Sequence, residues 1–266
     1  METNELKIAI IGAGNMGGAI ARGFSRGTLV DTNKIFASDI SDKNLNELKE
    51  FANDITVSKS NVEIVHNADI VIIAVKPWLV KAVADDIERK IDYKKQIIVS
   101  IAAGVSFEQL AEYFDTDAVF FRVIPNTAID VLQSVSTVSS KNATAEQENL
   151  ILSLFGELGK VFLVPETQLN AFMALSSCGI AYAFRYIRAA TEGGVEMGIY
   201  PNVAKEVVIQ TLRGAIELLE ANDSHPEVEI DKVTTPGGIT IKGLNEMEAN
   251  GFSNAVIKGL KASHLK

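Results

Sequence analysis

The chain has 266 residues, of which 47% are hydrophobic and 22% are charged, and its formal net charge is −9 at pH 7. Such a composition is typical of a globular protein, and an acidic chain without a basic cluster is a poor candidate for binding nucleic acid or a membrane surface. The single cysteine and three scattered histidines exclude a disulfide framework and predict no metal site.

The first part of the chain, up to about residue 164, alternates short apolar runs with helical patterns. This alternation predicts an α/β fold with a doubly wound, mostly parallel sheet. The predicted strands are 8–11, 34–37, 70–75, 96–101, 119–123 and 135–138, and the predicted helices are 16–26, 42–52, 79–90 and 145–158.

After Pro165 the strand signals stop. Apolar residues at helical spacing predict a long helix over 168–196, a second helix from Pro201 to about residue 219, a break at Pro226 and further short helices. We therefore expect two domains, 1–164 and 165–266, the second of them all-α. Because the first long helix is apolar on more than one face, we expect it to pack against another subunit, in at least a homodimer.

A glycine-rich turn joins the first predicted strand to the first predicted helix. Its residues are Ile11, Gly12, Ala13, Gly14, Asn15, Met16 and Gly17. In a dinucleotide-binding turn, Gly12 allows the tight bend, Gly14 lets the backbone approach a pyrophosphate and Gly17 allows close packing of helix and strand. The helix N-terminus then offers free N–H groups to the phosphates. The strand–turn–helix context favours dinucleotide binding in residues 1–164, although a turn kept only for packing gives the same pattern.

The second predicted strand leads into Ser38 and Asp39. Asp39 lies roughly 20 residues after Gly17, where an acid commonly bonds the adenosine ribose of NAD. A 2′-phosphate beside this carboxylate would cost up to about 4 kcal/mol per charge pair at contact distance. None of the residues 40–42, which directly follow Asp39, is an arginine, so we expect a preference for NADH over NADPH. The alternative is that Asp39 caps the helix that begins near Asp42.

Three further loops follow predicted strands, at the edge where open α/β sheets bind ligands. They contain Ala74, Val75, Lys76 and Pro77, then Ile101, Ala102 and Ala103, and finally Asn126. We expect the first two loops to touch the cofactor and Asn126 to border the nicotinamide. A solvated cation at Lys76 and a simple turn at Asn126 are open alternatives, and we expect Trp78 to pack against the protein.

Residues 234–241 form a loop of small and hydroxyl-bearing residues that leads into a helix. Pro236, Gly237 and Gly238 cannot continue a helix, and a helix N-terminus of this kind can bind a carboxylate through backbone N–H groups. The alternative is a plain turn with Thr240 as the N-cap. Cys178 lies in an apolar helical context without a nearby histidine, so we expect a buried small hydrophobe rather than a nucleophile.

Four motifs together resemble the pyrroline-5-carboxylate reductase family, over nearly the whole chain. They are residues 11–17, 74–77, 122–127 and 234–240, of which the last is similar to the C-terminal signature of the family. The chain departs from the family in two places. Residues 176–180 read Ser-Ser-Cys-Gly-Ile where the family has Ser-Gly-Ser-Gly-Pro, and residues 39–40 read Asp-Ile where the family often has Asn-Arg. The second departure adds to the expected preference for NADH.

The resemblance implies an N-terminal Rossmann domain and a C-terminal helical dimerisation domain, often in rings of dimers, with the substrate at the dimer interface. It implies reduction of 1-pyrroline-5-carboxylate to L-proline by NAD(P)H, the last step of proline biosynthesis. Carried over by motif, Gly238, Ile239 and Thr240 would hold the substrate carboxylate. The Thr240 hydroxyl would bond the ring nitrogen, Thr235 would line the pocket, and Asn61 and Asp39 would lie near the adenosine ribose.

Other functions are open at this point. For the implied reaction, positioning the nicotinamide ring against the imine ring can lower the barrier by roughly 7–11 kcal/mol. Such a reaction needs little acid–base help, which fits the absence of a clear acid–base pair from the sequence. A β-hydroxyacid-type dehydrogenase needs a lysine in the first helix of its helical domain, and residues 168–196 contain none. A nicotinamide-sensing regulator with the same fold and a reductase of another cyclic imine remain as alternatives. No apolar run is long enough for a membrane helix and residues 1–7 lack a secretory pattern, so we expect a cytoplasmic protein.

Overall fold

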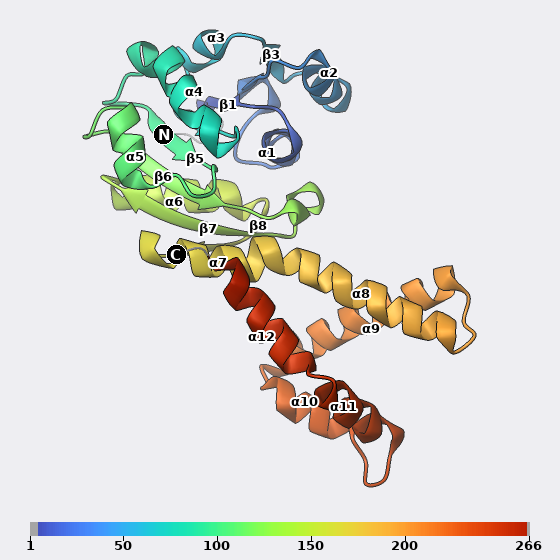
Figure 1. Ribbon diagram of the computed structural model, residues 1–266. Coiled ribbons are helices and arrows are strands. Elements are labelled where there is room, and N and C mark those ends of the chain that lie inside the picture. The colour runs from blue at the N-terminus through green and yellow to red at the C-terminus, as the bar shows by residue number, and fades with distance from the viewer. Residues whose placement is uncertain (1–4, 265–266) are drawn as a thin grey trace. The chain divides into compact units, whose positions relative to one another are not determined.

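The computed structural model describes residues 5–264. The chain divides into two compact units, Met1–Ser177 and Cys178–Lys266. The first is an α/β unit and the second is helical (Figure 1). This division by contacts falls after Ser177 and so assigns residues 165–177 to the first unit. The division into domains after residue 164 stays a prediction.

An eight-stranded sheet forms the centre of the first unit within the described residues, and its order is β3-β2-β1-β4-β5-β6-β7-β8. Its strands are β1 (Ile8–Ile11), β2 (Ile35–Ser38), β3 (Thr56–Ser58), β4 (Ile70–Ile73), β5 (Ile97–Ser100), β6 (Val119–Ile124), β7 (Ser134–Lys141) and β8 (Gly159–Leu163). Neighbouring strands are parallel except β6 and β7, which pair antiparallel. The predicted doubly wound, mostly parallel sheet is confirmed. Its strand order reverses between β1 and β4, and such sheets bind ligands beyond the carboxyl ends of the strands at that point.

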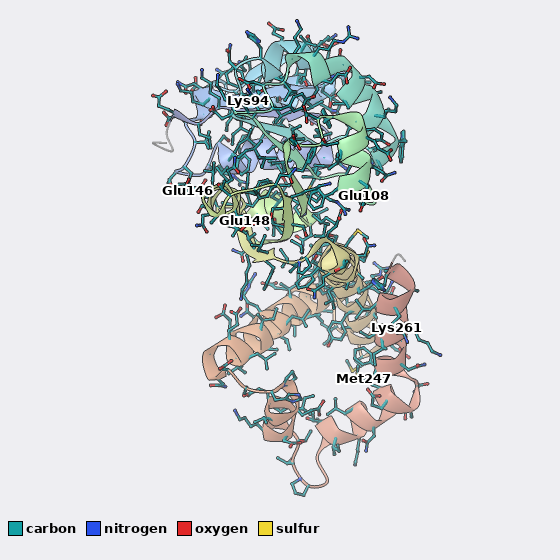
Figure 2. The ribbon with its side chains drawn as sticks, turned by 90° about the vertical axis from the view of Figure 1, so that its left-hand side faces the viewer. Lys94, Glu108, Glu146, Glu148, Met247 and Lys261 are labelled. Atoms are coloured by element: carbon teal, nitrogen blue, oxygen red, sulfur yellow. The ribbon has the colours of Figure 1, made fainter. Side chains whose placement is uncertain are left out.

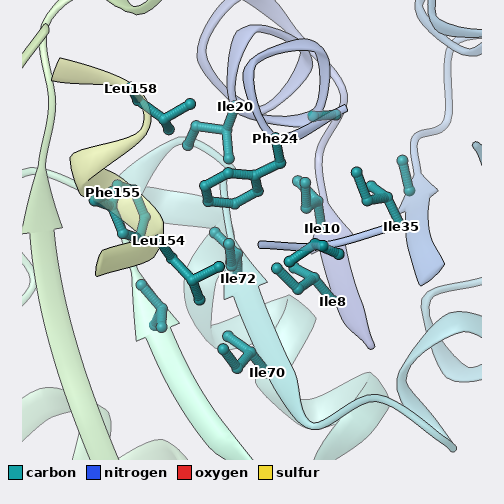
Figure 3. Packing of buried hydrophobic residues seen from close by; sticks show 14 of the residues in the cluster. Ile8, Ile10, Ile20, Phe24, Ile35, Ile70, Ile72, Leu154, Phe155 and Leu158 are labelled. Carbon is teal, nitrogen blue, oxygen red and sulfur yellow. The ribbon is translucent and has the colours of Figure 1, made fainter. Parts of the chain in front are cut away.

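Each face of the sheet is covered by its own helices. Side chains alternate along β1, so Ile8 and Ile10 enter one core while Ala9 and Ile11 enter the other. Helices α1, α2 and α6 complete the first core (Figure 3), and α3, α4 and α5 complete the second. Their bounds are α1 (Asn15–Phe24), α2 (Asp42–Phe51), α3 (Asn61–Val65), α4 (Val80–Ile87), α5 (Phe107–Tyr113) and α6 (Ala145–Gly156).

The sequence patterns missed β3, β8, α3 and α5. β3 has three residues and none of them is buried, and no side chain of β8 is fully buried. β3 therefore shows no apolar run, whereas β8 contains a short one at residues 161–163 that was not assigned to a strand. α3 and α5 have only five and seven residues, which is too short for a helical period to stand out.

A buried ion pair joins β6 to the segment that follows β8. Arg122 Nη1 lies 2.6 Å from Glu166 Oε1, and the two side chains are 7% and 27% exposed. The same oxygen accepts a hydrogen bond of 2.8 Å from the backbone N–H of Phe107, at the start of α5. The Arg122 guanidinium also lies 6.0 Å from the centre of the Phe107 ring. Glu166 therefore holds three separate stretches of the chain together.

The predicted long helix over 168–196 is present, but one π-helical turn interrupts its α-helical geometry at the centre. α7 (Leu169–Met173) passes into a π-helical turn at Ala174–Cys178, and α8 (Gly179–Glu196) follows. Here the Ser177 hydroxyl donates to the carbonyl of Pro125 at 3.0 Å, and the carbonyl of Ser176 accepts from Asn126 Nδ2 at 3.4 Å. Because one wide turn shifts the apolar spacing by only one residue, the pattern still reads as a helix.

The second unit contains α8 and four further helices over its described residues. They are α9 (Pro201–Asn222), α10 (Pro226–Val233), α11 (Ile239–Ala249) and α12 (Phe252–Ser263). Pro201 begins α9, as predicted, and Pro226, predicted as a break, begins α10 after the turn that follows α9. α8 packs closely on α9, because a Cβ atom on Gly194 would lie 2.9 Å from the Cβ of Ala204. The hydroxyl groups of Tyr182 and Ser263 bond α8 to α12.

The helical unit buries almost nothing within itself. Of its described residues, only Gly194 and Ala204 are buried. Large apolar side chains are exposed on every one of these helices; they include Phe184, Met197, Tyr200, Val207, Ile216, Leu218, Val233, Ile239, Met247 (Figure 2), Val256 and Ile257. Apolar surface of this extent needs a covering partner, in agreement with the predicted packing against another subunit.

Candidate active site

The glycine turn after β1 has an open side. Gly12 has a φ of +96°, and a Cβ there would lie 2.7 Å from the carbonyl oxygen of Ala74. A Cβ on Gly17 would lie 1.9 Å from the carbonyl oxygen of Gly12, whereas a Cβ on Gly14 would meet no atom within 4 Å. Packing inside the chain therefore explains Gly12 and Gly17 but not Gly14. A glycine that faces open space fits the close approach of a pyrophosphate to the backbone.

The first turn of α1 is free to bind an anion. Gly14 is the N-cap, no side chain caps the helix, and no acidic residue stands in its first turn. Asn15 begins the helix, and Met16 is half-buried against the core. Uncapped N–H groups at a helix N-terminus attract phosphate, so this turn can hold the pyrophosphate of a dinucleotide.

Asp39 follows β2 and reaches the glycine turn. Its Oδ2 accepts hydrogen bonds from the backbone N–H of Ala13 at 2.8 Å and from Asn44 Nδ2 at 3.1 Å. Its Oδ1 accepts from the backbone N–H of Ser41 at 2.8 Å. The alternative that Asp39 caps α2 is wrong, because the N-cap is Ser41, whose hydroxyl accepts from the N–H of Asn44. The carboxylate therefore stands beside the turn, where an acid can meet a ribose.

Asn61 and Ser38 lie beside the same edge. The Ser38 hydroxyl donates to Asn61 Oδ1 at 2.7 Å, and Asn61 Nδ2 donates to Asp86 Oδ2 on α4 at 3.0 Å. Ser38 is fully buried, and the N–H of Asp39 donates to the carbonyl of Ser58 at 3.3 Å. The ends of β2 and β3 are thereby joined, which brings Asn61 near Asp39 as the resemblance implies.

The loop after β4 closes against β1 and carries exposed side chains. The N–H of Ala74 donates to the carbonyl of Ile11 at 2.8 Å, and Val75 and Pro77 are half-buried. Lys76 is exposed and makes no ion pair with any residue among 5–264. The expectation that Trp78 packs against the protein is wrong, since it is 75% exposed. Its position after Pro77, in a short 3₁₀ turn, turns the ring outward.

The loops after β5 and β6 complete this edge. After β5, Ile101 is half-buried, Ala102 is buried and Ala103 is exposed. Asn126 is 7% exposed, and its Oδ1 accepts from the N–H of Ala128 at 3.1 Å. Its side chain thus caps the 3₁₀ turn that follows, and it also bonds the π-helical turn. The alternative that Asn126 belongs to a simple turn accounts for these hydrogen bonds. A contact between Asn126 and the nicotinamide remains a prediction.

The loop before α11 lies in the helical unit. Gly237 has a φ of +71°, and the N–H of Gly238 donates to the carbonyl of Thr235 at 2.9 Å. Gly238 is the N-cap of α11 without a side-chain cap, so the alternative with Thr240 as N-cap is wrong. Ile239 and Thr240 form the exposed first turn, and Thr235 is exposed as well. Their backbone N–H groups and hydroxyls are available to a carboxylate.

No group of three or more His, Cys, Asp or Glu within residues 5–264 is arranged to hold a metal ion. Over the same stretch, no helix has both the length and the apolar character needed to cross a membrane. Cys178 is half-buried rather than fully buried as expected. Each unit therefore offers its own candidate binding region: the carboxyl edge of the sheet in the first unit, and the N-terminus of α11 in the second.

Two protein-family models match the chain. Residues 166–266 match the family described as pyrroline-5-carboxylate reductase dimerisation, and residues 7–104 match the family described as NADP oxidoreductase, coenzyme F420-dependent. The first match covers the helices whose apolar side chains are exposed, and the second covers the glycine turn and Asp39.

Known proteins are similar along the whole chain. The pyrroline-5-carboxylate reductase of Arabidopsis thaliana is 36% identical over 262 residues, which cover 97% of this chain and 94% of that protein. Pyrroline-5-carboxylate reductase 1 of Dictyostelium discoideum is 35% identical over 96% of this chain, although the match spans only 48% of that longer protein. The crystal structure of Plasmodium falciparum pyrroline carboxylate reductase with NADP bound superposes with a TM-score of 0.89 at 26% identity, covering 99% of this chain and 96% of that one.

Proposed function

The chain belongs to the pyrroline-5-carboxylate reductase family, and we propose that it reduces 1-pyrroline-5-carboxylate to L-proline with a reduced nicotinamide dinucleotide. It is an oxidoreductase with a Rossmann-type domain and a helical dimerisation domain. The observation that carries the proposal is the open glycine turn at Gly14, where the chain leaves space beside an uncapped helix N-terminus. The relatives supply the identity of the imine.

The residues at the carboxyl edge of the sheet fit a dinucleotide. We place the pyrophosphate on residues 11–17 and the adenosine ribose at Ser38, Asp39 and Asn61. The nicotinamide end then extends across β4, β5 and β6, over residues 74–77, 101–103 and Asn126. Bound there, the cofactor supplies a hydride.

We propose that NADH is preferred over NADPH. Asp39 makes no ion pair with any residue among 5–264, so its negative charge is not neutralised by the protein. The 2′-phosphate of NADPH would meet that charge at close range, whereas the 2′-hydroxyl of NADH can donate a hydrogen bond to it. The rates with the two cofactors, measured side by side, test this preference.

The substrate carboxylate is assigned to the N-terminus of α11. Gly238, whose own N–H donates to the carbonyl of Thr235, caps this end, so the N–H groups of Ile239 and Thr240 would bind the carboxylate, and Thr235 lines the same loop. Reduction adds a hydride to the imine carbon and leaves one proton on the ring nitrogen, which becomes the amine of proline. The Thr240 hydroxyl orients that nitrogen and passes a proton between it and water. The main task of the chain is then to position the imine and the nicotinamide ring for hydride transfer.

The assembly and location follow from the same family. The helical domain makes the protein a homo-oligomer, and we propose a dimer at minimum, with the possibility of a ring of dimers, in the cytoplasm. The apolar side chains left exposed on α8, α9, α11 and α12 would be covered by the second copy. The alternative of a non-catalytic sensor has no support among the relatives, which are named as reductases.

A paired substitution tests the substrate half of the site. Thr240→Ala should lower kcat by about one to two orders of magnitude, at the lower end of the range for groups that handle protons. Thr211→Ala is the matched control, because the Thr211 hydroxyl is exposed and bonds only the carbonyl of Val207 in its own helix. Near-normal turnover in Thr240→Ala would remove this hydroxyl from the mechanism. Equal losses in both variants would indicate a general effect on the helical unit.

A further inference from the structure

Asn44 is the one side chain among residues 5–264 that donates a hydrogen bond to Asp39. The other two donors are the backbone N–H groups of Ala13 and Ser41. Asn44 stands in the first turn of α2, and its own N–H donates to the hydroxyl of Ser41. The following residue, Leu45, is buried in the core. The amide of Asn44 is therefore held by the cap and by the packing of its helix.

The hydrogen bonds from the protein use three of the acceptor positions of the Asp39 carboxylate. An ionised carboxylate has about four lone-pair positions, two on each oxygen. Asp39 Oδ2 accepts from both Ala13 and Asn44, whereas Oδ1 accepts, within the part of the chain that the structure describes, only from Ser41. One position remains, on Oδ1. A ribose hydroxyl can fill it by donating a proton, and a phosphate oxygen without a proton cannot.

We propose that Asn44 is a specificity-determining positioning residue, which selects NADH by fixing the orientation of the Asp39 carboxylate. The backbone N–H groups of Ala13 and Ser41 engage one oxygen each, and Asn44 adds the contact that fills Oδ2, so the position left for a ribose hydroxyl lies on Oδ1. The nearby charges do not replace this role, because Asp42 and Lys59 pair with each other at 2.7 Å. The inference rests on the proposed dinucleotide cofactor and adds a residue that the sequence analysis did not identify.

The same network ties ribose recognition to the phosphate-binding turn. Ala13 lies between Gly12 and Gly14, and its N–H is held by the oxygen that Asn44 also holds. A direct change at Asp39 would disturb the turn and weaken both cofactors together. A change at Asn44 leaves both backbone donors in place, so it isolates the orientation of the carboxylate.

The test is a comparison of cofactor dissociation constants in Asn44→Ala and Asn46→Ala. Asn46 lies on the same helix, is exposed and has no hydrogen bond to Asp39. Binding of NADH and of NADPH is followed through the fluorescence of the reduced nicotinamide, without substrate. We expect Asn44→Ala to raise the Kd of NADH by about threefold to tenfold, the scale of one charge-assisted hydrogen bond partly replaced by water. The Kd of NADPH should change by less than about twofold, and Asn46→Ala should change neither.

Three results would overturn the inference. They are a wild-type preference for NADPH, equal weakening of both cofactors in Asn44→Ala, and no change in that variant. The readout is binding alone, so it is independent of the reaction. If the wild-type protein binds NADH selectively and loses that selectivity in Asn44→Ala but does not reduce 1-pyrroline-5-carboxylate, the role of Asn44 stands and the proposed reaction fails.

Discussion

The buried ion pair between Arg122 and Glu166 gives a sharp prediction about stability. Glu166→Gln keeps the shape of the side chain and an oxygen that can accept from Phe107, but it removes the negative charge. Arg122, whose side chain is only 7% exposed, then keeps a buried positive charge without its counter-ion. Breaking a fully buried pair costs about 3–5 kcal/mol. Because the Glu166 side chain is 27% exposed, water screens part of this loss, and we expect about 2–3 kcal/mol.

Thermal and urea unfolding measure this loss. At roughly 2–4 °C per kcal/mol for a chain of this size class, the Tm should fall by about 4–12 °C. Glu192→Gln is the matched control, since Glu192 pairs with Arg188 and the two side chains are 62% and 70% exposed. That variant should stay within about 0.5 kcal/mol of the wild type.

A double-mutant cycle separates the lost pair from other effects of the substitution. In an Arg122→Met background no buried cation remains, so Glu166→Gln should then cost less than about 1 kcal/mol. If Glu166→Gln matches the surface control, or costs the same with and without Arg122, the buried charge is not what makes this contact stabilising.

Three further predictions concern other parts of the chain. Ser177→Ala removes the bond to the carbonyl of Pro125 and should lower kcat roughly tenfold through a misplaced loop, whereas Ser176→Ala, whose hydroxyl bonds within its own helix, should not. Sedimentation should find a dimer or larger species at micromolar concentration. A monomer would contradict the proposal that a second copy covers the exposed apolar side chains of the helical unit. The hydrogen bond from Lys232 lowers the pKa of Glu229; this contribution to stability is present above the unfolded pKa of about 4.3 and is lost as pH falls through the lower folded value. Glu229→Gln should flatten that acid limb of unfolding.

The architecture of the first unit was readable because its strands are buried on both faces. Runs such as those of β1 and β4 are apolar at every position, and this continuity needs no knowledge of distant contacts. The edge strand β3 lacks it and was missed. The other edge strand, β8, has a short apolar run, but none of its side chains is fully buried, and it was missed as well. The π-helical turn was also missed, because the contact that accompanies it, between Ser177 and the loop after β6, joins residues far apart in the sequence.

The sequence predicted those parts of the candidate site in which the backbone geometry allows only one type of residue. Gly12 and Gly17 are required by contacts shorter than a Cβ allows, and this requirement appears in the sequence as glycine at fixed spacing. Asn44 had no such signal, because its role depends on α2 bringing its amide to Asp39. Trp78 was placed wrongly for a related reason: apolar character alone does not show whether a side chain after a strand turns inward or outward.

The central claim is tested most directly by adding 1-pyrroline-5-carboxylate to the protein with NADH or with NADPH and following the reduced-nicotinamide absorbance. The account predicts rapid oxidation, with one proline formed for each cofactor consumed, and a faster reaction with NADH. Cofactor binding without oxidation of either cofactor would contradict the proposed reaction, and faster oxidation of NADPH would contradict the role assigned to Asp39.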